Sequence, residues 1–183
     1  MELVLIRHGE PDRSMLENRG FVGHGYDLVP LTPRGVEQAR RAAASPLLEG
    51  AQLLVTSPYT RAMQTAAEIC RITGLEMRVE LDLRELEKDL TGRCDSLREI
   101  ERLHQDFLAC HGEYPPGETR KWETVSQLSA RVCPVLDRYA HYDKIVVVTH
   151  GGVIRRFIKQ IKIEYAQPYL VQVTSPVQCY GWV

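Results

Sequence analysis

The chain has 183 residues, and its 23 Lys and Arg nearly balance its 24 Asp and Glu, which gives a net charge of −1. This length is typical of one domain, here residues 1–183, that buries a hydrophobic core without disulfides or structural metals. The balanced charge favours neither nucleic acid nor an anionic membrane surface as a partner, so any anion site must be local.

The cysteines and the start of the chain both favour a reduced, cytoplasmic setting. The five cysteines have wide, irregular spacings and no C-x-x-C pair, which fits neither a disulfide framework nor a zinc site. No basic leader precedes the apolar run Leu3–Ile6, and Arg7-His8 ends that run too early for a signal peptide or membrane span. We therefore expect a cytoplasmic protein with free thiols.

Apolar runs typical of strands alternate with segments whose apolar residues recur every three or four positions. In chain order the predicted strands are Glu2–Ile6, Gln52–Thr56, Met77–Leu83 and Lys144–Thr149. The predicted helices carry apolar faces at Val36, Ala39, Ala43 and Leu47; Ala62, Ala66, Ile69 and Ile72; Leu97, Ile100, Leu103 and Phe107; Val125, Leu128, Val132, Val135 and Tyr139; and Val153, Ile154, Phe157, Ile158 and Ile161. Because parallel strands need crossover connections, this alternation predicts an α/β fold with a mostly parallel sheet and helices on both faces.

Two histidines directly follow two of the predicted strands. His8 comes after Arg7 at the end of the first strand, and His150 follows the strand that begins at Lys144. Sites in such sheets open at the carboxyl ends of strands, so neighbouring strands would bring these rings together. Arg61 follows another strand and adds a second guanidinium, and guanidinium groups suit the oxygens of a phosphate dianion. The pattern predicts a phosphate site.

A histidine would have to react directly at this site, because these motifs contain no metal ligand set and no Ser or Cys nucleophile with an adjacent base. Neutral imidazole is a competent nucleophile, and nearby arginines disfavour its protonated form. Glu85, just beyond the strand that starts at Met77, could give a proton to the leaving alkoxide. Gly151 and Gly152 at the start of the last helix add backbone N–H donors.

Five blocks of residues occur in order over nearly the whole chain. They are Leu5–Glu10, Pro30–Gly35 with Gln38-Ala39, Ser57–Ala66, Gly117–Thr119 and Val147–Gly152. In this order and spacing they resemble the histidine phosphatase superfamily, which includes cofactor-dependent phosphoglycerate mutases and many small phosphatases. The resemblance implies a three-layer α/β/α sandwich with a short helical insertion over the site.

The resemblance also implies residue roles for a phosphatase that needs no metal and no cofactor. His8 would be the phosphorylated nucleophile and Glu85 the proton donor. The phosphoryl group would be held by Arg7, Arg61 and His150. We further expect Ser14 and Gly151 to bind the substrate. The family often has Asn where this chain has Ser14, and Asn18-Arg19 could take over that contact.

Three functions are compatible with these motifs. The favoured one is hydrolysis of a small phosphorylated metabolite, because between Glu85 and Lys144 the chain has only two helical segments and a short loop, whereas the family's mutases carry larger insertions. A cofactor-dependent phosphoglycerate mutase is the alternative, and a noncatalytic phospho-ligand binding module is disfavoured by the presence of His8. Zinc binding by the two histidines is disfavoured by the nearby guanidiniums. The substrate and the oligomeric state stay open.

Other conspicuous residues receive structural interpretations. Trp122 is expected to pack between the inserted helices. Surface or loop positions are expected for His24, His104, His111, His141 and the pair Arg155-Arg156.

Overall fold

The computed structural model describes residues 1–14, 16, 25–94 and 96–182, so Asn18, Arg19 and His24 lie outside the described residues. The described residues form one sheet with the strand order β3-β2-β4-β1-β5. The strands are β1 (Glu2–Arg7), β2 (Leu53–Thr56), β3 (Met77–Val79), β4 (Lys144–Thr149) and β5 (Pro168–Gln172). All neighbours are parallel except β5, which runs antiparallel to β1, so the mostly parallel sheet is confirmed.

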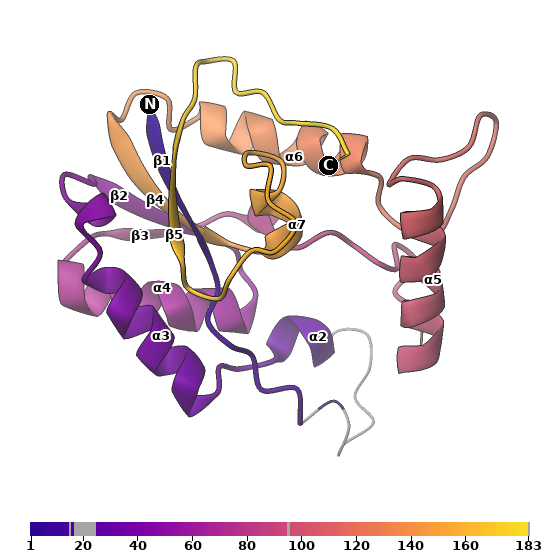
Figure 1. The fold of residues 1–183 in the computed structure, drawn as a ribbon, viewed down its shortest axis with the longest axis horizontal. Coiled ribbons are helices and arrows are strands. Elements are labelled where there is room, and N and C mark those ends of the chain that lie inside the picture. The colour runs from indigo at the N-terminus through magenta and orange to yellow at the C-terminus, as the bar shows by residue number, and fades with distance from the viewer. Residues whose placement is uncertain (15, 17–24, 95, 183) are drawn as a thin grey trace.

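Helices cover both faces of this sheet, which confirms the three-layer arrangement (Figure 1). The helices are α2 (Gly25–Leu28), α3 (Pro33–Ala43), α4 (Thr60–Thr73), α5 (Leu97–Ala109), α6 (Val125–Asp137) and α7 (Gly151–Ile154). Successive β1 side chains point to opposite faces of the sheet. Val4 and Ile6 pack with α3 and α4 on one face. Leu3 and Leu5 pack with α6 and α7 on the other. This alternation follows from the two-residue period of a strand.

The turn after β1 is fixed by a close approach of two backbone segments. A Cβ atom on Gly9 would lie 2.4 Å from the carbonyl oxygen of Gly35, and one on Gly35 would lie 2.3 Å from that of Glu10. The Gly9 N–H also donates to Thr65 Oγ1 of α4 at 2.9 Å. Both glycines are therefore required for α3 and α4 to hold the chain directly after His8.

The insertion that contains α5 lies to one side of the sheet and has its own apolar cluster (Figure 1). Trp122 in this cluster is buried and donates from Nε1 to Asp106 Oδ2 at 2.8 Å, which confirms its predicted packing role. The C-terminal segment, residues 173–182, crosses α6, where the free thiols of Cys133 and Cys179 lie 2.6 Å apart. Arg156 then binds this segment through the Gly181 carbonyl at 2.5 Å.

Several predicted elements are shorter than expected. Helix α3 ends at Ala43 and α6 at Asp137, before the predicted face residues Leu47 and Tyr139. The strand predicted to reach Leu83 ends at Val79, because the chain forms a 3-10 turn that leaves Leu81 exposed and turns Leu83 into the core. The helix predicted to reach Ile161 ends at Ile154, after which the chain continues in turns and leaves Ile161 exposed.

Strand β5 was not predicted. It is an edge strand that begins at Pro168, and its alternate residues Tyr169 and Val171 pack against the core although they are only half-buried. Among the helices formed by the described residues, none has the length and apolar character needed to cross a membrane.

Candidate active site

The register of β1 and β4 places the two predicted histidines side by side. Arg7 pairs with Thr149 across the parallel strands, so the next residues, His8 and His150, leave the same edge of the sheet. Their ring centroids are 5.2 Å apart. Arg61 in the first turn of α4 reaches the same place after β2. The structure thus brings together residues that are separated by up to 143 positions in the chain, the distance from Arg7 to His150.

Hydrogen bonds from Arg61 define the protonation of both rings. Its Nε donates to His8 Nε2 at 3.1 Å and its Nη2 to His150 Nδ1 at 3.3 Å. A guanidinium has only donors, so both of these ring nitrogens carry lone pairs. The other nitrogens are donors, from His8 Nδ1 to the Gly9 carbonyl and from His150 Nε2 to Ser57 Oγ, each at 2.7 Å. Both imidazoles are therefore neutral.

Burial is the main reason for this neutrality. It lowers the pKa of His8 well below 6.5, and the charges of Arg61 and Arg7 lower it further. Burial likewise lowers the pKa of His150 well below 6.5, with added contributions from His8 and Arg61. The arginines, which the sequence pattern indicates as the cause, contribute less than the loss of water around the rings.

Arg7 has an unused donor at the site. Its Nη1 donates to the Ile163 carbonyl at 2.7 Å, and its guanidinium carbon lies 4.1 Å from the centre of the Tyr165 ring. Its Nε is buried and has no hydrogen-bond partner among the described residues. A buried donor without a partner is costly, so this N–H favours an acceptor such as a phosphoryl oxygen.

Glu85 is anchored by backbone amides. Its Oε1 accepts from the N–H of Leu86 at 2.9 Å and from that of Gly152 at 3.0 Å, whereas Oε2 has a longer 3.4 Å contact with Gly152. A Cβ atom on Gly152 would lie 2.4 Å from Oε1. The Gly152 N–H, predicted to bind an anionic ligand, instead donates its hydrogen bond to Glu85.

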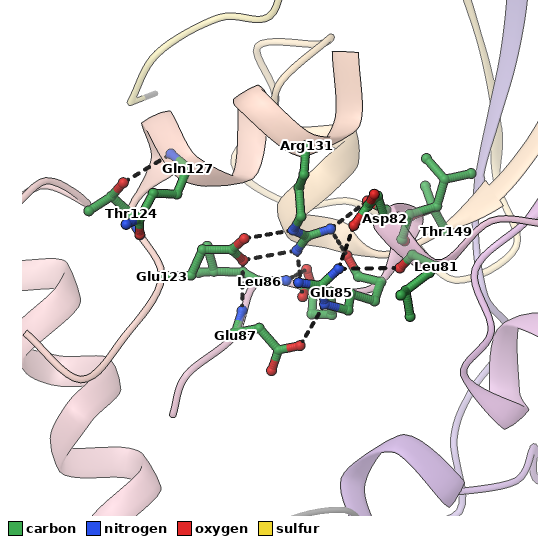
Figure 2. A network of polar contacts seen from close by, with 12 residues as sticks. Leu81, Asp82, Glu85, Leu86, Glu87, Glu123, Thr124, Gln127, Arg131 and Thr149 are labelled. Atoms are coloured by element: carbon green, nitrogen blue, oxygen red, sulfur yellow. Dashed lines mark hydrogen bonds and ion pairs between the residues drawn. The ribbon is translucent and has the colours of Figure 1, made fainter. Parts of the chain in front are cut away.

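Arg131 on α6 holds the segment that carries Glu85 (Figure 2). Its Nε and Nη2 donate to the two carboxylate oxygens of Glu123 at 2.6 and 2.9 Å. The same guanidinium donates to the carbonyls of Asp82, Arg84 and Glu85 at 2.5, 3.0 and 3.0 Å. Neither Arg131 nor Glu123 is predicted by the sequence pattern, because no local motif shows which carbonyls α6 will meet.

Most of the predicted site residues open into a cavity of about 460 Å³, whereas His150 is fully buried and is not among the described residues that line it. Arg7, His8, Arg61 and Glu85 line it, and so does Gly151. Further cations at its wall are Arg13 and Lys88, neither of which the sequence analysis singled out.

Some residues lie elsewhere in the structure than the sequence predicts. Ser14 is exposed, its N–H donates to Asp12 Oδ1 at 3.0 Å, and it is not among the described residues that line the cavity. Arg156 is only 4% exposed, so the exposed helix face predicted for it was wrong, whereas Arg155 is exposed as predicted and His104 is half-buried. All three line the cavity. Within the described residues, no group of three or more His, Cys, Asp or Glu side chains is placed to hold a metal ion.

Comparison with known proteins gives one family. The model of the histidine phosphatase superfamily (branch 1) matches residues 3–175. The adenosylcobalamin/alpha-ribazole phosphatase of Escherichia coli is 28% identical over 166 residues, which cover 88% of this chain and 79% of that protein. The 2,3-bisphosphoglycerate-dependent phosphoglycerate mutase 2 of Lactobacillus johnsonii is 25% identical over 207 residues, covering 96% and 88% of the two chains. The crystal structure of the alpha-ribazole phosphatase from Shigella flexneri shares the fold with a TM-score of 0.67 at 24% identity, covering 100% and 96%.

Proposed function

The chain belongs to the histidine phosphatase superfamily, and from this premise we propose that it hydrolyses phosphomonoesters of small metabolites through a covalent phosphohistidine on His8. The observation that carries the proposal is the hydrogen bond from Arg61 Nε to His8 Nε2. It identifies Nε2 as the nitrogen with the lone pair and places a guanidinium at the point where phosphoryl oxygens would arrive. We also propose that the reaction needs no metal and no cofactor.

In the first step His8 Nε2 attacks phosphorus and the bond from phosphorus to the ester oxygen breaks. As the substrate enters, the hydrogen bond that Arg61 Nε–H donates to His8 would be replaced by one to a phosphoryl oxygen. Arg7 Nε, which is buried beside the site, would donate to a second oxygen. The hydrogen bond from His8 Nδ1 to the Gly9 carbonyl stabilises the positive charge that the ring gains on phosphorylation.

Glu85 would supply the proton that the leaving alkoxide needs. Its Oε2 is the less engaged of the two carboxylate oxygens, so we assign the proton to Oε2. In the second step the resulting carboxylate takes a proton from water, the hydroxide attacks phosphorus, and the bond from phosphorus to Nε2 breaks. Phosphate leaves, and His8 and Glu85 return to their starting states.

The test is phosphate release from a panel of phosphomonoesters in the presence of EDTA, with wild type compared with His8→Ala. We expect turnover by the wild type that resists EDTA and is lost in the variant. An alkaline quench during turnover should preserve a phosphorylated protein. Acid should release its phosphoryl group, as a phosphohistidine requires. Turnover by His8→Ala at the wild-type rate would exclude His8 as the nucleophile.

A mutase remains the second candidate, because a relative named as a phosphoglycerate mutase aligns with 96% of this chain. It would interconvert 2- and 3-phosphoglycerate in the presence of 2,3-bisphosphoglycerate and release little phosphate. Binding of phosphorylated compounds without either activity would identify a noncatalytic binding module. The same protein preparation distinguishes the three functions.

A further inference from the structure

We infer that the alcohol half of the substrate carries an apolar ring system, which binds between α5 and the C-terminal segment. This inference rests on the proposed function, because it assumes that the phosphoryl group lies against His8. The cavity that contains His8 continues from the edge of the sheet to the inner side of α5. Its volume of about 460 Å³ is within the range of roughly 300–1,000 Å³ found for pockets that enclose drug-sized ligands. A phosphoryl group alone would leave most of it unfilled.

The two ends of the cavity differ in chemistry. The end at the sheet is formed by charged and polar groups around His8. The far end is lined by side chains of α5, α6 and the C-terminal segment, and most of them are apolar: Ile100, Phe107, Leu108, Val125, Leu128 and Trp182. A ligand that spans the cavity therefore has an anionic head and an apolar body.

Aromatic side chains form a wall at the far end. Phe107 lies nearly parallel to the ring of His104, at an interplanar angle of 14°, and it meets Trp182 edge to face at a centroid distance of 5.3 Å. Trp182 packs over Gly112, where a Cβ atom would lie 2.7 Å from its ring. Packing contacts therefore hold the rings of this wall in place, and flat apolar groups pack well against such rings.

His104 adds a polar group to this wall, and Arg156, which also lines the cavity, binds the Gly181 carbonyl beside Trp182. Its Nδ1 is buried and has no hydrogen-bond partner in the described part of the chain. Burial lowers the pKa of His104, so a neutral ring faces the cavity. The rings of Phe107 and Trp182 offer no hydrogen-bond partners, so hydroxyl groups placed against them would be left unsatisfied, whereas a flat apolar ring would not.

The decisive measurement is the equilibrium binding of two nonhydrolysable probes, 3-phenylpropylphosphonate and propylphosphonate. They differ only in the phenyl ring. We expect the phenyl compound to bind wild-type protein at least about tenfold more tightly, since even one methylene in a fitted pocket changes selectivity by about 10-fold or more. A smaller difference would overturn the inference.

Two leucines on α5 provide a matched pair of variants. Leu108 and Leu97 are each 38% exposed, but only Leu108 is among the described residues that line the cavity. Leu108→Asn should remove most of the preference for the phenyl compound, and Leu97→Asn should keep it. Trp182→Ala and Tyr180→Ala repeat the comparison on the C-terminal segment, where only Trp182 lines this cavity among the described residues. Equal effects within either pair would refute the assigned location.

Phosphate release from 2-phenylethyl phosphate and ethyl phosphate keeps the two proposals separable. Tighter binding of the phenyl phosphonate without release from either ester would refute hydrolysis and support the ring subsite. Release from both esters, with equal binding of the two phosphonates, would support hydrolysis and refute the ring subsite.

Discussion

Arg131 and Glu123 form a bidentate ion pair that is almost fully buried, with 11% and 5% of the two side chains exposed. The guanidinium also binds the backbone carbonyl of Glu85, so the pair connects α6 to the segment that carries the proposed acid. Because a carboxylic acid must meet the leaving oxygen at hydrogen-bond distance, this connection should affect proton transfer more than phosphate binding.

Replacing Arg131 with Lys should displace Glu85 while retaining a cation. Lysine lacks the planar fork that reaches Glu123 and the three carbonyls together. We expect kcat/KM for ethyl phosphate to fall about 10²-fold, at the low end of the contribution of a general acid. The loss for p-nitrophenyl phosphate should be much smaller, because its leaving group needs no proton.

The control for this prediction is Arg138→Lys. Arg138 is also paired with a glutamate, Glu80, but its side chain is 55% exposed. This variant should retain both activities. Equal losses on the two esters in Arg131→Lys, together with a lower melting temperature, would reduce the role of Arg131 to stabilising the fold.

Gly152→Ala should disturb Glu85 from the other side. The added methyl group would occupy the position now 2.4 Å from Glu85 Oε1, so the carboxylate must move. We expect Gly152→Ala and Glu85→Gln to behave alike. In both variants kcat/KM should fall more for alkyl phosphates than for p-nitrophenyl phosphate. Wild-type kcat/KM for ethyl phosphate in Gly152→Ala would contradict the proposed position of the acid.

Arg61→Gln should change both the rate and its pH dependence. The positive charge of Arg61 is the second largest cause of the lowered pKa of His8, so its removal raises that pKa, although burial still holds it down. The acidic limb of the kcat/KM profile should therefore move to higher pH. The maximum rate should fall by about 10²-fold or more, as for loss of a donor to the transition state.

Arg61→Lys provides the matched comparison for this variant. It keeps the charge, so the acidic limb should stay near its wild-type position while the rate still falls because the guanidinium fork is lost. An acidic limb that lies at the same pH in Arg61→Gln and in the wild type would contradict the assignment of this limb to His8.

Stability should decrease as the pH falls below about 6.5. His8 and His150 have lowered pKa values in the folded protein, so the unfolded chain binds more protons in the range between the unfolded value of 6.5 and the lower folded values. For each unit by which the pH falls within that range, each ring should reduce the free energy of unfolding by about 1.4 kcal/mol. Well above pH 6.5 neither ring should affect it. Urea unfolding between pH 5 and 8 measures this slope, and His8→Gln should lower it by one histidine's share.

The sequence by itself determined the parallel core of the sheet, β1, β2 and β4, and the positions at which these strands end. The apolar run that ends at Arg7 and the run from Lys144 to Thr149 are long and uninterrupted, because both strands are buried between two helical layers. The chemistry at their ends was also readable, since parallel strands place His8 and His150 at the same edge. Edge strand β5 carries only a short apolar run, Tyr169–Val171, and only one of its residues is fully buried.

Only the tertiary structure decided what surrounds these histidines. Arg131 meets the carbonyls near Glu85, and Trp182 meets Phe107, across 46 and 75 residues of chain. Such contacts depend on how helices and terminal segments pack, and packing is governed by shape and burial that no local pattern encodes. For the same reason His104, a surface histidine by sequence, lies at the wall of the cavity.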